Sequence, residues 1–343
     1  MKKIYFFSPS NLKPTGGVKQ IYRQVDILNQ LQYDASVLLK KKSKKANQWY
    51  FNKKIVYNYN FFEKVLNTLT NNNISKKIKK QIKKFTDTPI EKDSIIVMPE
   101  IYGSQMHHAL DNRKFVIFNQ NCYYTFNHYH FSYSKDNPYL DKNCLGVIVA
   151  SQDAYEYLNY VFPEVNIQKI TLGIDDKIFN YSEKKRKKIC YMPRKLSEDS
   201  EQVIVILKAK AIIEGWELCA IDDMEEHEVA KHLKESILFL SFNHREGFGL
   251  PPVEAMACGC YVIGYRGQAG KEYLNPEFSQ PVADGDIISF VKEIEKTIQT
   301  FNEKPSHILD MGKKASEYIR STYSLKHEIE TTQTAWENLL RQL

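Results

Sequence analysis

Two glutamates eight positions apart enclose a glycine-containing segment that could bind a sugar or an anion. Glu246 and Glu254 are the ends of the sequence EGFGLPPVE, which follows an apolar run at residues 237–241 and opens a predicted helix. Glycines beside a helix N-terminus present unpaired backbone N–H groups and a partial positive charge. Pro251 and Pro252 fit the first helical turn, where no N–H is needed. One carboxylate can therefore face a ligand while the other lines the start of the helix.

Further candidate residues follow predicted strands in the first half of the chain. Gly16 and Gly17 come after the first strand and begin a helix; such a turn is either structural or a phosphate contact, because a backbone without Cβ can approach a phosphate closely. Glu100 ends another strand, and ligands in open α/β sheets sit at the carboxyl ends of strands. Glu100 is therefore a candidate general base. His107 and His108 lie on a predicted helix and form a weaker catalytic pair.

The amides at the end of the next strand, Asn119, Gln120 and Asn121, could orient a substrate. The aromatic-rich stretch at residues 123–133 could line a sugar or lipid acceptor site, although core packing explains each single residue equally well. Asp284-Gly285-Asp286 could be mistaken for a metal site, but a turn with a helix N-cap is the better interpretation.

Apolar strand patterns alternate with amphipathic helix patterns along the whole chain, which predicts parallel sheets covered on both sides. Strands are predicted at residues 4–8, 35–39, 94–98, 115–119, 146–150, 188–191, 216–221, 237–241 and 261–264. Helices are predicted at residues 18–31, 201–210, 225–234, 307–321 and 325–343. The pattern restarts after residue 170, where a turn-like segment marks a domain boundary.

The 343 residues suffice for two domains, and the charges divide in the same way. Residues 1–150 hold 24 Lys and Arg against 10 Asp and Glu, whereas the remainder holds 24 against 31. We expect an N-terminal domain at 1–172, a C-terminal domain at 173–322 and a C-terminal helix at 323–343 that packs near the first domain. The basic half should meet an anionic partner.

Composition favours a globular protein of a reducing compartment. The six cysteines form no C-x-x-C pair and no metal-ligand spacing with the histidines, which predicts buried free thiols and no metal site. The apolar run at residues 4–7 is too short for a signal peptide, and no stretch approaches the ~18 apolar residues of a membrane span. The expected location is the cytoplasm.

The segment E-G-F-G-L-P-x-x-E-A-M-A-C-G resembles the donor-binding motif of GT-B glycosyltransferases, chiefly the large retaining group. The resemblance implies two Rossmann-like domains facing each other across a cleft, with the C-terminal helices crossing back to the N-terminal domain. It assigns Glu246 to the hydroxyls of the donor sugar and Glu254 to the ribose of the nucleotide. The loop residues Gly247, Phe248, Gly249 and Leu250 would lie near the sugar or the diphosphate.

The same resemblance extends to three other positions. Gly16 and Gly17 match the glycine loop that faces the donor phosphates in this family. The family has Gly-Arg after the first strand of its second domain and a Lys five residues later, which together neutralise the leaving diphosphate. Here Pro193 replaces the Gly and Lys195 directly follows Arg194, so this chain departs from the pattern. Arg194 suits phosphate through its planar fork, and Lys195 is the substitute for the displaced lysine.

The implied reaction transfers a sugar from a nucleoside-diphosphate sugar to an acceptor hydroxyl, with retention and without a metal or other cofactor. The implied role lies in surface polysaccharide or glycolipid synthesis. An inverting route would need a base such as Glu100. The alternatives are a nucleotide-sugar epimerase on the same fold and a non-catalytic sugar-binding scaffold.

A lysine-rich segment at residues 60–85 bears on the acceptor. It begins with Phe61 and Phe62 and ends with six lysines, so it is either a surface helix that touches anionic lipid or a solvated face. Aromatic residues are not interleaved with the lysines, which argues against nucleic-acid binding. The predicted partners are thus a nucleotide-sugar donor, a saccharide or lipid-linked acceptor and an anionic membrane surface, which would place the protein peripherally at the inner membrane face.

Overall fold

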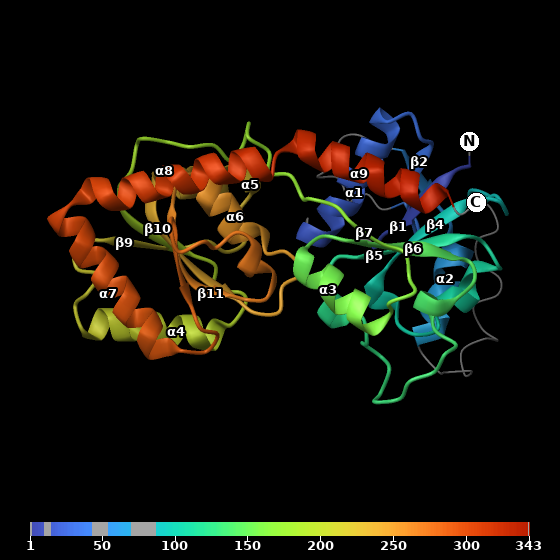
Figure 1. The fold of residues 1–343 in the computed structure, drawn as a ribbon, viewed down its shortest axis with the longest axis horizontal. Coiled ribbons are helices and arrows are strands. Elements are labelled where there is room, and N and C mark those ends of the chain that lie inside the picture. The colour runs from blue at the N-terminus through green and yellow to red at the C-terminus, as the bar shows by residue number, and fades with distance from the viewer. Residues whose placement is uncertain (1, 10–14, 43–53, 70–86, 342) are drawn as a thin grey trace. The chain divides into compact units, whose positions relative to one another are not determined.

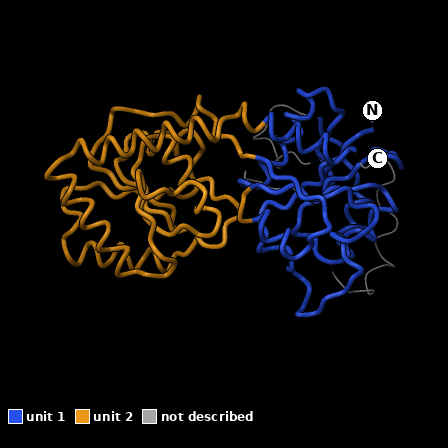
Figure 2. Tube along the Cα trace, viewed as in Figure 1, with its two compact units in different colours: residues 1–150, 154–170, 329–343 blue, residues 151–153, 171–328 orange. Residues whose placement is uncertain are grey.

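The computed structural model describes residues 2–9, 15–42, 54–69, 87–341 and 343. The chain forms two compact units (Figure 2). Unit 1 comprises residues 1–150, 154–170 and 329–343, and unit 2 comprises residues 151–153 and 171–328. The C-terminal residues 329–343 thus belong to the same unit as the N-terminal residues.

Unit 1 is built on a parallel sheet of seven strands in the order β3-β2-β1-β4-β5-β6-β7 (Figure 1). Its strands are β1 Ile4–Phe7, β2 Ala35–Leu39, β3 Ile55–Tyr57, β4 Ile95–Pro99, β5 Phe115–Asn119, β6 Cys144–Val149 and β7 Ile167–Lys169. Its helices are α1 Gly16–Gln30, α2 Tyr59–Leu69 and α3 Gln152–Val161, with the short 3-10 helices η1 Glu100–Tyr102, η2 Met106–Leu110, η3 Cys122–Tyr124 and η4 Pro138–Leu140.

Alternate residues of β1 bury against different helices, because successive side chains of a strand point to opposite faces. Phe7 stacks on Phe62 of α2 with ring centroids 3.9 Å apart. Phe6 instead contacts Trp336, which lies on the last helix, α9 Leu325–Leu340. Every residue of β1 is buried, and coverage on both faces is what the continuous apolar run predicts.

Unit 2 is built on a parallel sheet of five strands in the order β12-β11-β10-β8-β9. Its strands are β8 Arg186–Tyr191, β9 Glu217–Ala220, β10 Ser236–Asn243, β11 Tyr261–Arg266 and β12 Ser279–Val282. Its helices are α4 Ser197–Ala209, α5 Glu226–Glu235, α6 Leu250–Ala257, α7 Ile287–Glu303 and α8 Pro305–Thr322, with the 3-10 helix η5 Ala269–Glu272. Helices α4 and α7 pack together, as do α6 and α8, so that the two pairs cover opposite faces (Figure 1).

The predicted strands and helices are present with shifted ends, and both sheets are parallel as expected. Phe61, Phe62 and Val65, at the start of the lysine-rich segment, lie on α2 and are buried in the core of unit 1. They therefore face the sheet and not a membrane. The six lysines of that segment, Lys76, Lys77, Lys79, Lys80, Lys83 and Lys84, lie outside the described residues.

Two further expectations concern cysteines and membrane spans. The six cysteines are free, and all are buried except the half-buried Cys144, as predicted. Within the described part of the chain, no helix combines the length and the apolar character needed to cross a bilayer.

Candidate functional site

The carboxyl ends of two neighbouring strands bring Lys195 and Glu246 together in unit 2. Strands β8 and β10 are paired and parallel, so the segments that follow them leave the sheet at the same edge. Lys195 comes after β8, and Glu246 comes after β10. The Lys195 ammonium forms an ion pair with the Glu246 carboxylate. The lysine side chain is 51% exposed and the glutamate 15%, so the carboxylate is recessed while its partner can move.

Gly249 gives the loop after Glu246 its shape. Its φ of +85° lies in the left-handed region, and it is the N-cap of α6. The hydroxyl of Tyr273 donates to the carbonyl of Phe248 over 2.8 Å, and the side-chain amide of Asn243 donates to that hydroxyl over 3.4 Å. Tyr273 is fully buried, and burial raises the pKa of its hydroxyl well above the ordinary value. Buried hydrogen bonds thus hold the loop backbone directly before the N-terminus of α6.

Two further residues predicted for this site, Glu254 and Arg194, also belong to unit 2. Glu254 is half-buried on α6, and Pro251 and Pro252 occupy the first turn of that helix as predicted. Arg194 is exposed beside Lys195, just before the left-handed Leu196 that precedes α4. The site therefore combines two carboxylates, two cations and a helix N-terminus, which are the groups that bind sugar hydroxyls and phosphates.

In unit 1, hydrogen bonds join four of the residues that the sequence marks as candidates. Gly16 and Gly17 are the first residues of α1. The side-chain amide of Gln120 donates to the carbonyl of Gly17 over 3.1 Å. The backbone N–H of Gln120 donates to the Glu100 carboxylate over 3.2 Å, and that of Asn121 donates to its other oxygen over 3.1 Å. The glycine turn, the glutamate and the amide-rich loop therefore form one hydrogen-bonded cluster.

Glu100 has an unusual environment for a carboxylate. It is buried, and burial raises its pKa to about 7, although hydrogen bonds from backbone N–H groups favour the charged form. A pKa near neutrality suits a general base. Both oxygens are nevertheless engaged with backbone N–H groups, so the observed contacts are those of a residue that positions the loop at 120–121.

The remaining sequence candidates of unit 1 divide between core and surface. Asn119 is buried and donates to Thr125 and Tyr139 over 2.9 Å each. Tyr129 is buried, whereas Phe131 and Tyr133 are exposed. In unit 2, Asp286 accepts a hydrogen bond from the backbone of Ser289 over 3.0 Å and caps α7, which confirms the predicted turn and N-cap.

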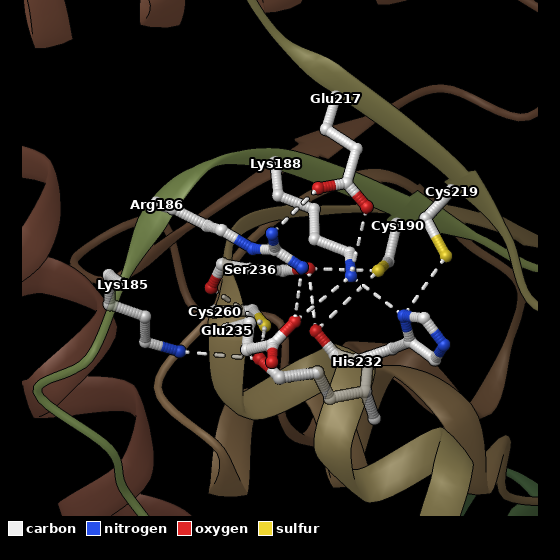
Figure 3. A network of polar contacts seen from close by, with 11 residues as sticks. Lys185, Arg186, Lys188, Cys190, Glu217, Cys219, His232, Glu235, Ser236 and Cys260 are labelled. Atoms are coloured by element: carbon white, nitrogen blue, oxygen red, sulfur yellow. Dashed lines mark hydrogen bonds and ion pairs between the residues drawn. The ribbon is translucent and has the colours of Figure 1, made fainter.

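A second polar network, which no sequence motif indicates, lies toward the amino end of β8 (Figure 3). The fully buried ammonium of Lys188 lies 2.7 Å from Nδ1 of His232, 3.2 Å from the Glu217 carboxylate and 3.3 Å from that of Glu235. Burial and the neighbouring ammonium lower the pKa of His232. No ligand motif marks these residues, and their mutual contacts are those of a structural ion-pair network.

A segment of unit 2 is similar to a known protein family. Residues 215–318 match the model of the family "Glycosyl transferases group 1". An alpha-1,6-glucosyltransferase of Actinobacillus pleuropneumoniae serotype 7 (strain AP76) is 28% identical over 123 residues, which are 35% of this chain and 36% of that relative. The alignment thus spans about a third of the relative's length. Both matches confirm the resemblance that Glu246 and Glu254 suggested.

Several solved structures share the fold of this chain over nearly its whole length. Sucrose-phosphate synthase from Thermosynechococcus elongatus superposes with a TM-score of 0.67 at 12% identity, covering 100% of both chains. A variant of S. aureus TarM, in complex with UDP and other ligands, gives 0.64 at 15% identity and 99% coverage of both chains. The pneumococcal O-GlcNAc transferase GtfA, in complex with UDP and GlcNAc, gives 0.67 at 10% identity, again over 99% of both. These similarities confirm the GT-B fold.

Proposed function

We propose that this chain, whose residues 215–318 match the glycosyl transferases group 1 family, is a glycosyltransferase that moves a sugar from a nucleoside-diphosphate sugar to an acceptor hydroxyl. The proposal rests chiefly on one observation, the pairing of Lys195 with Glu246 beside the N-terminus of α6. UDP in the solved structures of TarM and GtfA supports a nucleoside diphosphate as the donor's leaving group.

The Lys195–Glu246 ion pair opens when the donor binds, and each residue then contacts a different part of the donor. A sugar hydroxyl donates to the Glu246 carboxylate, and the Lys195 ammonium turns to the diphosphate. Arg194 and the N-terminus of α6 add positive potential where the leaving group gains charge, so the residues of the chain stabilise it electrostatically and without a metal. Glu254 holds the ribose. The donor roles of Gly16 and Gly17 stay predictions from the family resemblance.

Transfer proceeds with retention, and the leaving phosphate helps to deprotonate the acceptor. The contacts of Glu100 support this route, because both of its oxygens already accept backbone hydrogen bonds. An inverting route would need that carboxylate to be released from the loop.

The acceptor is a saccharide or a lipid-linked saccharide of surface polysaccharide or glycolipid synthesis. A basic first half of the chain supports an anionic membrane surface as a further partner and a cytoplasmic protein peripheral to the inner membrane face. Sedimentation with anionic vesicles at low salt tests this part: failure to pellet contradicts it without affecting the donor site.

Calorimetry with UDP, GDP, dTDP and CMP tests the donor site. Wild type should bind one nucleoside diphosphate selectively, and Glu254→Ala should bind it much more weakly. Glu277→Ala, which removes an exposed carboxylate elsewhere in unit 2, is the matched control and should bind like wild type. If none of the four nucleotides binds, the transferase proposal fails and the scaffold alternative replaces it.

The separate roles of Lys195 and Glu246 are tested by comparing Lys195→Met with Glu246→Gln. Loss of the ammonium should weaken binding of the nucleoside diphosphate, whereas Glu246→Gln should leave it nearly unchanged and should abolish transfer from the intact nucleotide sugar. Equal effects of both substitutions on the free nucleotide would contradict the division of roles between the two residues.

A further inference from the structure

Two adjacent histidines of unit 1 converge on one carboxylate. His107 and His108 lie on η2, and Asp136 lies in the segment before η4. Nε2 of His107 is 2.9 Å from one oxygen of Asp136, and Nε2 of His108 is 3.1 Å from the other. Their three ligand atoms lie within 4.8 Å of one another. Both imidazoles therefore direct a coordinating nitrogen to the same carboxylate, each to a different oxygen.

The separations suit a small divalent cation. Ligands at about 2.0–2.1 Å from a tetrahedral zinc ion are about 3.3–3.5 Å apart, so the two nitrogen–oxygen distances need to open by only a few tenths of an ångström. Two imidazole nitrogens and one carboxylate are a donor set that zinc and its neighbours prefer, whereas Mg²⁺ and Ca²⁺ prefer oxygen ligands. Three protein ligands also leave a fourth position for water or a bound group.

Local structure holds these ligands in place before any metal binds. The His107 side chain is 3% exposed and is fixed by packing, whereas Asp136 is 61% exposed and accessible to a cation. The backbone N–H of Asp136 donates to the hydroxyl of Ser134 over 3.1 Å, and Asn137 caps η4 by accepting from Tyr139 over 3.1 Å. The carboxylate is therefore presented by a segment that is fixed on both sides.

A polar cavity adjoins the cluster. It has a volume of about 310 Å³, and its lining includes Asp136, the two nearby histidines His128 and His130, and Tyr129. The Tyr129 hydroxyl is buried and has no hydrogen-bond partner among the described residues. Buried polar atoms normally have hydrogen-bond partners, so this hydroxyl is an exception in the part of unit 1 next to the cluster.

We infer that His107, His108 and Asp136 form a binding site for a zinc-type divalent cation. The cation joins η2 to the segment at residues 128–136, and the cavity lies between that segment and residues 102–105, which directly precede η2. Its primary effect is to fix the shape of that cavity. The inference goes beyond the proposed function, since every ligand belongs to unit 1 and none takes part in the donor site.

The test uses full-length protein without a histidine tag, stripped with a chelator and then titrated with Zn²⁺ by calorimetry. Wild type should bind one equivalent, and Co²⁺ in its place should give the visible absorption of a low-coordinate site. Asp136→Asn and His108→Ala each replace an exposed side chain and should preserve the fold, checked by circular dichroism. Each should weaken binding at least about 100-fold, because even changes to residues behind a metal ligand cost 10–100-fold.

Asp93→Asn and His227→Ala remove an exposed carboxylate and an exposed imidazole elsewhere and should bind Zn²⁺ like wild type. Zn²⁺ should also slow hydrogen exchange in wild-type peptides covering residues 102–110 and 128–136. The inference is overturned if stripped wild type binds no equivalent of Zn²⁺. It is equally overturned if Asp136→Asn and His108→Ala bind as wild type does, since the metal would then lie at other residues, such as the cysteines.

Discussion

Replacing Gly249 by alanine should damage unit 2 through two separable effects. The first is conformational: a φ of +85° costs a residue with a Cβ about 1–2 kcal/mol. The second is steric: the new Cβ would lie 2.6 Å from the Tyr273 hydroxyl and 2.7 Å from the Asn243 amide nitrogen, well inside an ordinary contact of about 3.5–4.0 Å. Both neighbours are buried, so neither can move away freely.

The steric effect should cost about 1–3 kcal/mol, as overpacking does in well-packed cores. It also endangers the 2.8 Å hydrogen bond from Tyr273 to the Phe248 carbonyl, whose loss would cost about 1 kcal/mol. The conformational and steric effects together should lower the free energy of unfolding of Gly249→Ala by about 2–5 kcal/mol, and by about 1 kcal/mol more if that hydrogen bond is lost.

Gly285→Ala is the matched control. Gly285 has a φ of +79°, and a Cβ built there would meet no atom within 4 Å. It should therefore lose only the conformational part, about 1–2 kcal/mol. The entropy that alanine removes from the unfolded chain is the same in both variants and cancels in the comparison.

Urea unfolding, with hydrogen exchange in peptides of β10 and β11 to assign the change to unit 2, measures the difference between the two variants. Gly249→Ala should be less stable than Gly285→Ala by about 1–3 kcal/mol, and it should bind nucleoside diphosphate more weakly as well. Equal destabilisation, with equal nucleotide binding, would show that Tyr273 does not hold the loop as described.

Three further predictions concern charged groups. Lys188→Met should destabilise unit 2 by about 2–4 kcal/mol, because it leaves partly buried acids without their buried partner. Lys210→Met should cost under about 1 kcal/mol, since its ion pair with a glutamate is about half exposed. Similar urea midpoints for the two variants would contradict the burial of the Lys188 ammonium. Hydrogen bonds from Lys3 and Tyr5 lower the pKa of Glu91 from 4.5 to about 2, so the folded state gains stability above pH 4.5 and loses it as the pH falls towards 2. Glu91→Gln should abolish this loss of stability at acid pH. The loss in wild type should amount to no more than about 1 kcal/mol, because water screens the ion pair. If stability falls with pH equally steeply in the variant and in wild type, the prediction is wrong. Burial raises the pKa of Glu100 from 4.5 to about 7, so its contribution to the stability of the fold is full below pH 4.5 and is lost as the pH rises through 7. The stability advantage of wild type over Glu100→Gln should therefore shrink by up to about 3 kcal/mol between pH 5 and 8. A constant difference would show that this carboxyl does not titrate in that range.

The central strands could be predicted from the sequence because they are buried on both faces and form continuous apolar runs. The strands that escaped prediction, β3, β7 and β12, all lie at the edge of a sheet. They have three or four residues each, and β12 contains Pro281, which an edge strand tolerates because one side of it needs no ladder hydrogen bonds. Short, one-sided pairing leaves little trace in local composition.

The candidate sites show a similar limit. Glu246 and Glu254 belong to one continuous segment, so a motif could reveal them. Lys195 lies 51 positions before Glu246, and only the pairing of β8 with β10 brings the two together. Asp136 lies 28 positions after His108 in a segment without regular structure, so the spacing of ligands along the chain could not predict their cluster.

The cluster around Glu100 also limits how a loss of activity can be interpreted. The sequence suggests separate roles for Gly17, Glu100 and Gln120, yet Gln120 bonds to both of the others. Groups within one hydrogen-bond network do not act additively, so a Glu100 variant that loses activity has lost either a base or the position of the glycine turn. Gln120→Ala separates these explanations, since it removes the contact to Gly17 and keeps the carboxylate. If the two variants lose activity equally and the double variant loses no more, Glu100 acts by positioning. If only the Glu100 variants change the pH dependence of turnover near 7, the carboxyl takes part in proton transfer.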